Sequence, residues 1–333
     1  MKKYEEVPYF KGIDDRRNIL SKDDLKGNYT ILIFYPKHLP GEYLEEVLQI
    51  SQQHIKYNKI SGIEGFDVNL IIVTPDTEEY LAGLRDENDL DITFISDKNL
   101  EISNLFNVIE RDSVQRKAYI LDRWVRLRDV CEDTNPIFVD KLYEKIENIV
   151  FDDFSIDKNI EFRRAKRSFS IKKVSDLEIK KIIEAATKAP SCFNNQPWRY
   201  HVINSDEKLK KSFEYIPDGN YWMKYSSALI AVYSKKEDDC ALNDSRDYFL
   251  FDTGMSVANL LLQATKMGII AHPVAGYKSE KLKKFLNIDD ESVLITVIAV
   301  GYPGAGEYLT EKHVEVENGP RIRKELDDIL KWN

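Results

Sequence analysis

The chain has 333 residues, 43% of them hydrophobic, which is enough for two buried cores of a globular protein. Its formal net charge of -9 argues against nucleic acid as a partner. We find no signal peptide and no apolar run of membrane-spanning length, so we expect a cytoplasmic protein without membrane contact. The three cysteines are widely spaced, and the five histidines show no ligand spacing. These patterns predict neither a disulfide framework nor a metal site.

The first half of the sequence alternates between strand-like and helix-like patterns. Residues 1–20 are polar and are expected to form an irregular arm. In chain order we then expect strands at 29–35, 68–73 and 92–95 with helices between them, strands at 117–121 and 125–130, and a helix at 137–150. This order predicts an α/β domain over residues 1–150, with an open sheet that is parallel at first and antiparallel at its end.

Four segments of this half have a recognisable pattern: residues 25–36, 73–76, 95–103 and 116–122. Together they resemble the peroxiredoxins, which are thioredoxin-fold peroxidases, over residues 15–148. The resemblance implies a thioredoxin-like fold. It also implies that the loop after the first strand should carry a peroxide-attacking cysteine.

That cysteine is missing from this sequence. The loop reads Pro36-Lys-His-Leu-Pro-Gly-Glu42, and neither its histidine nor its glutamate replaces a thiolate nucleophile. Arg116 matches a family arginine that polarises peroxide, and Cys131 lies beyond the second hairpin strand. We therefore predict that this domain has no peroxidase activity. Its expected role is packing, oligomerisation or covering a site on the second domain.

A short aperiodic stretch, residues 151–157, is interpreted as a linker, and a second domain is predicted over 157–333. It opens with Phe162-Arg-Arg-Ala-Lys-Arg-Ser-Phe169, interpreted as the start of a helix that places Arg163 and Arg167 on one face. Two interpretations stay open for this run. It is either a solvated basic face or an anion site, because guanidinium groups bind phosphate through paired hydrogen bonds.

The remaining elements follow from periodicity and capping residues. In chain order we expect a helix opened by the capping box Ser175 and Glu178, a strand at 199–203, a strand at 228–233, a helix at 251–268 ending at Gly268, a turn at 271–276, a helix at 281–286 and a strand at 293–300. Between the first helix and the first strand lies Ala189-Pro-Ser-Cys-Phe-Asn-Asn-Gln-Pro-Trp198. This proline-pinned segment is either a helix-stop turn or a functional loop.

Several of these pieces occur in the order found in one family. They are residues 162–169, 189–200, 252–268, 273–276, 300–303 and 321–326. They resemble the nitroreductase family of flavin enzymes over residues 157–332. The resemblance implies an α+β fold with a mixed sheet wrapped by helices. It also implies an intertwined homodimer with FMN bound at the subunit interface.

The same resemblance implies which residues contact the cofactor. Arginines would reach the FMN phosphate, the ribityl chain or the ring: Arg163, Arg164, Arg167, Arg321 and Arg323. Residues from the other subunit would line the flavin: Pro190, Ser191, Cys192 and Asn194. Lys224 would lie near the pyrimidine edge of the ring. A backbone N–H, that of Ala275, would point to the flavin N5 from the turn formed by Pro273, Val274, Ala275 and Gly276.

The sequence departs from the family pattern at Ala165, where a serine is common, and at Tyr221, where an asparagine is expected. The insertion at 307–318 leaves the alignment of Arg321 and Arg323 open. No protein nucleophile or general base is required, because the cofactor carries the redox chemistry. Cys192 is interpreted as a packing residue beside the flavin.

The function implied is an FMN-dependent oxidoreductase that takes electrons from NAD(P)H and reduces a nitroaromatic, a quinone or a similar small acceptor. Two alternatives stay open. One is a flavin enzyme with a dedicated substrate, such as a dehalogenase, an enone reductase or a flavin-destroying synthase. The other is a redox-inactive binding or scaffold protein.

Overall fold

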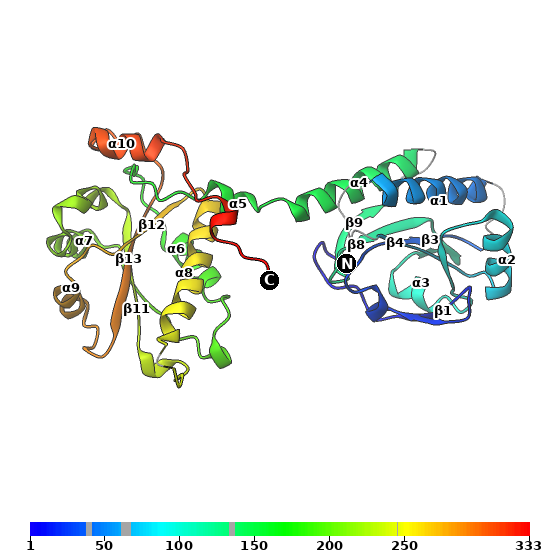
Figure 1. The fold of residues 1–333 in the computed structure, drawn as a ribbon, viewed down its shortest axis with the longest axis horizontal. Helices are drawn as coiled ribbons and strands as arrows, with labels where there is room; N and C mark the ends of the chain where they lie inside the picture. The colour runs from blue at the N-terminus through cyan, green and yellow to red at the C-terminus, as the bar shows by residue number, and fades with distance from the viewer. Residues whose placement is uncertain (38–41, 61–67, 133–136, 245) are drawn as a thin grey trace. The chain divides into compact units, whose positions relative to one another are not determined.

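The computed structural model describes the chain except residues 38–41, 61–67, 133–136 and 245, and it also leaves the side chains of 42, 56–60 and 137 undescribed. The chain forms two compact units, Met1–Ser155 and Ile156–Asn333, called here the N-terminal and the C-terminal unit. Figure 1 shows the elements of each unit. Among the described helices, none combines the length and the hydrophobicity that crossing a bilayer requires.

The N-terminal unit is built on a seven-stranded sheet in the order β2-β1-β5-β4-β3-β8-β9. Its strands are β1 Lys11–Asp14, β2 Ile19–Ser21, β3 Tyr29–Phe34, β4 Val68–Thr74, β5 Thr93–Ser96, β8 Lys117–Leu121 and β9 Leu127–Cys131, and a separate pair is β6 Ile109–Glu110 with β7 Ser113–Val114. Strands β3, β4 and β5 are parallel, and β8 and β9 are antiparallel to their neighbours. The predicted thioredoxin-like order is thereby confirmed.

Helices cover both faces of this sheet, because its central strands are buried on both sides. The helices are α1 Glu42–Ile60, α2 Glu78–Asn88, α3 Glu101–Leu105 and α4 Ile137–Phe154. Side chains of α1, α2 and α4 share one core with the sheet, and α3 contributes to the other. The expectation of an irregular arm at 1–20 is wrong, since β1 pairs with β5 and β2 pairs with β1, which extends the sheet by two strands.

The C-terminal unit has a four-stranded sheet in the order β10-β11-β13-β12, with antiparallel neighbours throughout. Its strands are β10 Arg199–Ile203, β11 Ala228–Ser234, β12 Ile270–Val274 and β13 Val293–Gly301. Its helices are α5 Lys158–Phe162, α6 Asp176–Ala186, α7 Asp206–Ser212, α8 Tyr248–Lys266, α9 Ser279–Leu286 and α10 Glu311–Asn318. Helices α6 and α8 pack on one face of the sheet, and α7 and α9 pack on the other (Figure 1).

Local sequence signals explain the two helices that position the site. Ser175 and Glu178 form the predicted capping box at the start of α6, where the serine hydroxyl accepts the N–H of Glu178. Helix α8 is followed by Gly268 with φ of 69°, a left-handed conformation that glycine adopts without strain. Of its predicted core residues, Leu260 and Ala264 are fully buried.

Three boundaries differ from the sequence expectations. Helix α4 continues to Phe154, so most of the predicted linker is helical. Helix α5 ends at Phe162, and the basic run that follows is not a helix, so a shared helix face for Arg163 and Arg167 is wrong. The segment 270–274 is a strand rather than a turn. Its proline is tolerated because β12 is at the edge of the sheet.

Candidate functional site

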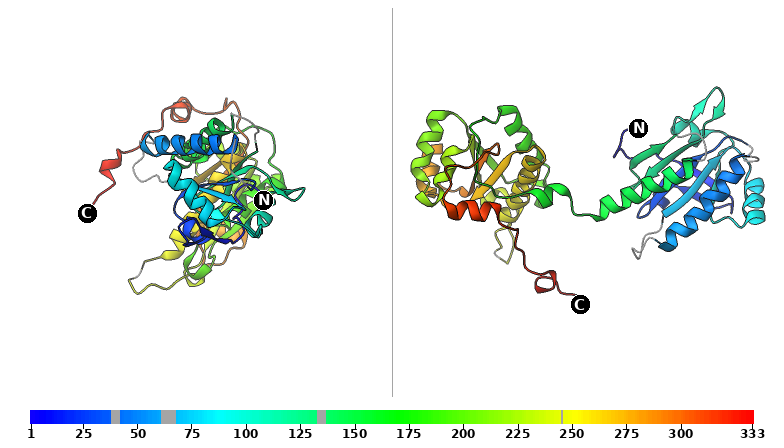
Figure 2. Two further views of the ribbon diagram at one scale, coloured as in Figure 1. Left: turned by 90° about the vertical axis from the view of Figure 1, so that its right-hand side faces the viewer. Right: turned by 90° about the horizontal axis from the view of Figure 1, so that it is seen from above.

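Arginines from two distant parts of the sequence gather beside α5. The chain after α10 returns past this helix (Figure 2), and Arg321 donates to the carbonyls of Ile160 at 3.2 Å and Glu161 at 2.5 Å, and also to that of Arg163. Because Arg321 occupies the carbonyls at the end of α5, its position is fixed by the helix. These contacts bring the chain end beside the first basic run, and the assignment of Arg321 and Arg323 to the FMN phosphate stays a prediction.

The electrostatics of this arginine cluster are unfavourable for the protein alone. Burial lowers the pKa of Arg163, and the charges of Arg321, Arg323 and Arg164 lower it further. The charged groups behind this shift are all cations. Arg164 donates to the carbonyl of Gly319 at 2.8 Å, and Arg323 donates to that of Ile322 at 2.7 Å. Each guanidinium has five N–H donors, so this cluster has the charge and the donors for an anion.

Next to the cluster, the backbone of Arg167 is held by the insertion that follows β13. Glu317 at the end of α10 is buried, and its carboxylate accepts the N–H of Arg167 at 2.7 Å and that of Ser168 at 3.2 Å. It also accepts the Ser168 hydroxyl. Tyr308 donates its hydroxyl to the Arg167 carbonyl at 2.8 Å. Glu317 could not be predicted from the sequence, because it lies in the insertion at 307–318, which has no counterpart in the family pattern.

The aromatic rings of Trp222 and His272 pack against each other beside the Arg167 guanidinium. Trp222 is 1% exposed, its ring centroid lies 4.5 Å from that of His272, and the Arg167 guanidinium lies 5.6 Å from the Trp222 ring centroid. The Nδ1 of His272 lies 3.0 Å from the Lys166 carbonyl, and we assign the proton to Nδ1 as the donor. Burial lowers the pKa of His272 to about 4, so its ring is neutral at pH 7.

The predicted turn residues follow from β12. Pro273 and Val274 close the strand, and Ala275 and Gly276 are exposed after it. The side chain of Asn220 donates to the carbonyl of Gly276 at 3.0 Å, and a Cβ at Gly276 would lie only 2.8 Å from the Asn220 Nδ2. The glycine therefore permits a close contact that fixes this turn against the 3-10 helix at Asp218–Tyr225.

Lys224 belongs to that 3-10 helix and lines a pocket of about 540 Å³. Tyr225 and Tyr308 are stacked in this pocket with ring centroids 3.5 Å apart, and Phe169 forms part of its wall. The hydroxyl of Tyr308 is the same group that holds the backbone of Arg167. The Lys224 pocket and the Arg167 segment are therefore neighbours joined by one tyrosine.

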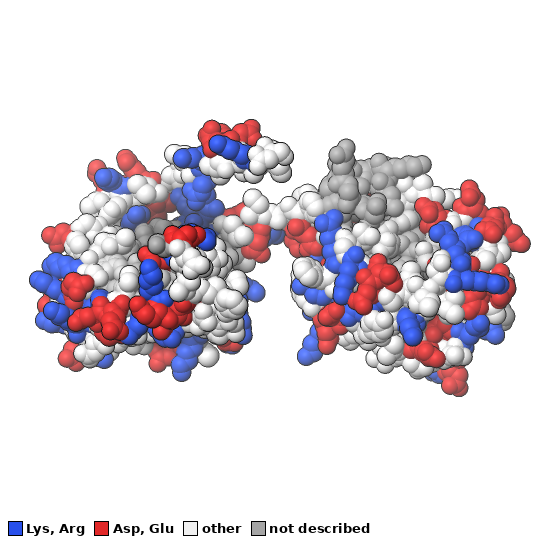
Figure 3. All heavy atoms as spheres, turned by 60° about the horizontal axis from the view of Figure 1, so that its bottom comes forward, with Lys and Arg blue, Asp and Glu red and all other residues white. Residues whose placement is uncertain are grey.

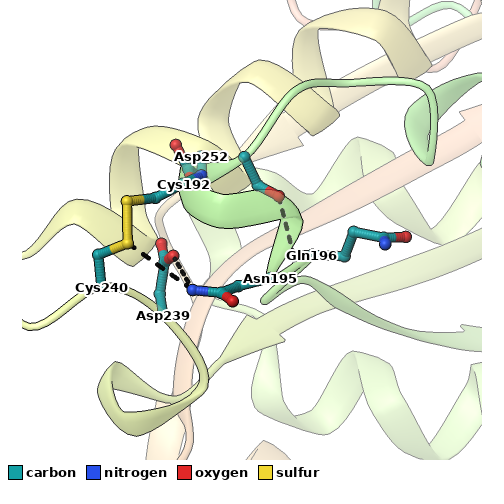
Figure 4. The surroundings of a disulfide bond; sticks show 7 residues. Cys192, Asn195, Gln196, Asp239, Cys240 and Asp252 are labelled. Atoms are coloured by element: carbon teal, nitrogen blue, oxygen red, sulfur yellow. Dashed lines mark hydrogen bonds between the residues drawn. A yellow bond between two sulfur atoms is a disulfide. The ribbon is translucent and has the colours of Figure 1, made fainter.

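The loop at 189–198 lies at a different pocket of about 470 Å³, lined by Pro190, Ser191 and Cys192 together with side chains of α8. Cys192 forms a disulfide with Cys240 (Figure 4), so the expectation of no disulfide is wrong. A sequence separation of 48 residues hides the pairing, which the packing of α8 beside the loop brings about. Asn194 is exposed, and the described contacts of this loop do not include the arginine cluster.

In the N-terminal unit, the predicted peroxide-polarising arginine is engaged by a carboxylate. Arg116 forms an ion pair with Glu46, which also accepts the hydroxyl of Tyr35 at 2.5 Å. The Arg116 guanidinium lies 4.4 Å from the ring centroid of Phe138. Cys131 is buried in β9, inside the core. Residues 38–41 of the loop predicted to have lost the nucleophile lie outside the described residues.

Comparison with known proteins identifies the family. The model of the Nitroreductase family matches residues 160–220 and 219–302, and that of the AhpC/TSA family matches 4–130. A protein from Archaeoglobus fulgidus called "Putative NADH dehydrogenase/NAD(P)H nitroreductase" is 32% identical over 150 residues, 44% of this chain and 84% of that protein.

An "NADH dehydrogenase" of Thermus thermophilus is 22% identical over 200 residues, 51% of this chain and 92% of that protein. A solved structure described as an oxidoreductase containing FMN is 26% identical, covers 54% of this chain and 91% of its own, and has a TM-score of 0.49. The chain belongs to the nitroreductase family through its C-terminal unit. Its N-terminal unit has the thioredoxin-like fold of the AhpC/TSA family.

Proposed function

We propose that the C-terminal unit binds FMN and that the protein is an FMN-dependent oxidoreductase. It would take electrons from NADH or NADPH and pass them to a small acceptor such as a nitroaromatic or a quinone. The observation that carries this proposal is the cluster of Arg163 with Arg164, Arg321 and Arg323. A phosphate monoester has nearly two negative charges, and it would offset the mutual repulsion of these cations, whose described contacts are with carbonyl groups and include no ion pair with a carboxylate.

The residues around the cluster fit the other parts of FMN. Arg167 extends from a backbone fixed by Glu317, so its guanidinium is preorganised for the ribityl chain or the ring edge. Lys224 offers a positive charge to a polar ring edge, and Ala275 offers a backbone N–H from the turn that Asn220 holds. When bound, FMN supplies the two-electron redox chemistry, and these side chains bind it, orient it and stabilise negative charge.

A homodimer is part of this proposal. The C-terminal unit exposes large apolar side chains: Ile171 at 99%, Phe193 at 92%, Ile322 at 82% and Trp332 at 86%. Exposed apolar groups of this size favour burial against a partner. The loop at 190–194 makes no described contact with the arginine cluster of its own chain. A second copy would bring this loop to the cofactor of its neighbour, as the family resemblance implies.

The distribution of charge does not favour nucleic acid as a partner. On the face shown in Figure 3, acidic and basic side chains are interspersed over each unit, which is unlike the continuous basic surface of a nucleic-acid-binding protein. We assign the N-terminal unit a structural role, because Arg116 is engaged by Glu46 and the sequence offers no cysteine between Pro36 and Glu42.

The function is tested on the purified full chain. We expect a yellow protein with the visible absorbance of bound flavin. This absorbance should disappear when NADH or NADPH is added without oxygen, and it should return when a quinone or nitroaromatic is added. A colourless protein that does not take up FMN would refute the proposal. A flavin that binds but is not bleached by either nucleotide would point instead to a flavin enzyme with a dedicated substrate.

The N-terminal unit is predicted to show no peroxidase turnover. With flavin-free protein, hydrogen peroxide and a dithiol donor, peroxide should be consumed no faster than in buffer without protein. The reason is that no thiolate occupies the nucleophile position. The measurement is peroxide loss with the protein freed of FMN. Turnover that survives removal of the flavin and disappears in a Cys131→Ser variant would show that this unit is a peroxidase.

A further inference from the structure

The proposed flavin function places Cys192 beside the neighbouring subunit's cofactor, but it does not use the disulfide that Cys192 forms with Cys240. Cys192 opens a short 3-10 helix in the loop at 189–198, and Cys240 lies in the segment between β11 and α8. Both cysteines are partly exposed, and Cys192 lines the 470 Å³ pocket together with Leu242, Tyr248 and Met255. The disulfide is therefore within reach of a small molecule, unlike a disulfide sealed in a core.

Two carboxyl groups lie beside this disulfide. Asp252 of α8 is 0% exposed, and its Oδ2 accepts the backbone N–H of Cys192 at 2.7 Å. Its Oδ1 and the Oδ2 of Asp239 are both buried without a hydrogen-bond partner in the described structure. Burial raises the pKa of Asp252, the Cys192 N–H that it accepts lowers it, and the neighbouring charge of Asp239 raises it. The raised pKa favours the protonated form of the Asp252 carboxyl beside the disulfide.

The surroundings of the two sulfur atoms differ. One carboxylate oxygen of Asp239 and the Sγ atoms of Cys192 and Cys240 lie within 4.8 Å of one another. The side-chain amide of Asn195 donates to the Asp239 carboxylate at 3.4 Å and points to the Cys240 Sγ at 3.7 Å (Figure 4). Cys192 lines the pocket, and Asp239 lies beside both sulfur atoms, whereas the amide donor of Asn195 is directed at the Cys240 Sγ. This arrangement makes Cys240 the better leaving group.

We propose that Cys192–Cys240 is a thiol–disulfide exchange site whose substrate is a dithiol that enters the pocket at Cys192, with Asp252 as its proton donor. One thiolate of the dithiol attacks the Cys192 Sγ, the Cys192–Cys240 bond breaks, and the electron pair leaves on Cys240. Cys240 takes the proton of Asp252, and Asp252 regains one from the solvent, into which the attacking thiol released its own. The second thiol of the dithiol then attacks the mixed disulfide and releases Cys192 as a thiol. The dithiol is oxidised to a disulfide, and two protein thiols form.

Reduction of the disulfide is expected to change the backbone conformation of the loop at 189–198. Phe193, Asn194 and Gln196 have φ of 47°, 59° and 52°, which are conformations that non-glycine residues adopt at a cost. The N–H of Gln196 is held by the Ser191 hydroxyl at 2.9 Å, and the disulfide ties the same turn to the segment before α8. Reduction removes one of these restraints. The inference concerns thiol chemistry and stands without the proposed flavin function.

The test uses the full chain and dithiothreitol as the probe. Aliquots are quenched with a maleimide of high mass, and the rate at which two protein thiols appear is read on a gel. Wild type should gain both thiols together. Asp252→Asn should slow this by at least about tenfold, because a positioned proton donor is lost. Asn195→Ala, at an exposed residue, should slow it about fivefold, the effect of one hydrogen bond.

Asp206→Asn on α7, an exposed aspartate paired with Lys173, is the matched control and should react like wild type. Cys240→Ser should show the Cys192 thiol without any reductant. The proposal is overturned if Cys192 and Cys240 are alkylated in the untreated protein, if dithiothreitol leaves the disulfide intact, or if Asp252→Asn and Asn195→Ala both react at the wild-type rate. If Asp252→Asn does not fold, the Asn195→Ala rate decides.

Discussion

Replacing Arg163 or Arg323 with alanine is expected to weaken FMN binding by about ten- to hundredfold. A hydrogen bond to a charged group contributes about 1.5–3 kcal/mol, and each 1.4 kcal/mol corresponds to about a factor of ten in affinity. Both side chains belong to the cluster that we propose to bind the phosphate. The measurement is the dissociation constant from the quenching of FMN fluorescence on binding to cofactor-free protein.

The same substitutions, which weaken FMN binding, should not lower the thermal stability of the cofactor-free protein. Without FMN, each arginine of the cluster is repelled by the others, so removing one leaves the cofactor-free unit as stable as before or more stable. At saturating FMN, the thermal stability of wild type should rise more than that of the variants. A ligand stabilises the folded state by an amount that grows with the logarithm of its concentration divided by its dissociation constant. Two thermal melts for each variant, with and without FMN, separate these effects.

Arg17→Ala is the matched control, because its side chain is 75% exposed and pairs with Glu79 in the N-terminal unit. It should bind FMN like wild type. Equal flavin affinity in wild type, Arg163→Ala and Arg323→Ala would rule out the phosphate assignment. A loss of affinity together with a loss of cofactor-free stability would mean that the arginines act by holding the chain end to α5.

The sequence predicted those elements whose local and tertiary preferences agree. Helix α6 has a capping box and an apolar stripe, and strands β11 and β13 are long apolar runs buried in the core. The prediction failed at residues 163–167, where helical spacing suggested a common face. There Arg321, 158 residues after Arg163, donates to the carbonyls that a longer α5 would use in its own hydrogen bonds. In addition, cations close together on a helix repel one another.

The candidate site was predicted as a set of residue types, and its assembly required the structure. The family pattern pointed to both arginine segments, and the fold brings Arg163, Arg164, Arg321 and Arg323 together. The disulfide escaped notice because its cysteines are 48 residues apart and belong to no spacing motif. Glu317 escaped because only the folded insertion reveals which backbone N–H groups its carboxylate accepts.

Replacing Glu317 with alanine is expected to lower the unfolding free energy of the C-terminal unit by roughly 2–3 kcal/mol. Its buried carboxylate accepts the N–H groups of Arg167 and Ser168 and the hydroxyl of Ser168. Without it, these partly buried donors lose their partner, at about 1–3 kcal/mol for each donor left unpaired. The measurement is denaturant unfolding followed by far-UV circular dichroism, with Glu315→Ala, an exposed residue of the same helix, as control.

Glutamine at the same position distinguishes two roles of Glu317 in FMN binding. As a negative charge near the arginine segment, it opposes a phosphate; as a hydrogen-bond acceptor, it holds the backbone from which Arg167 extends. Glu317→Gln keeps an acceptor oxygen and removes the charge, so it should bind FMN as tightly as wild type or more tightly. Glu317→Ala removes both and should bind more weakly, because an Arg167 that is no longer preorganised loses entropy on binding. If alanine and glutamine both tighten binding, the charge dominates and the positioning role is wrong.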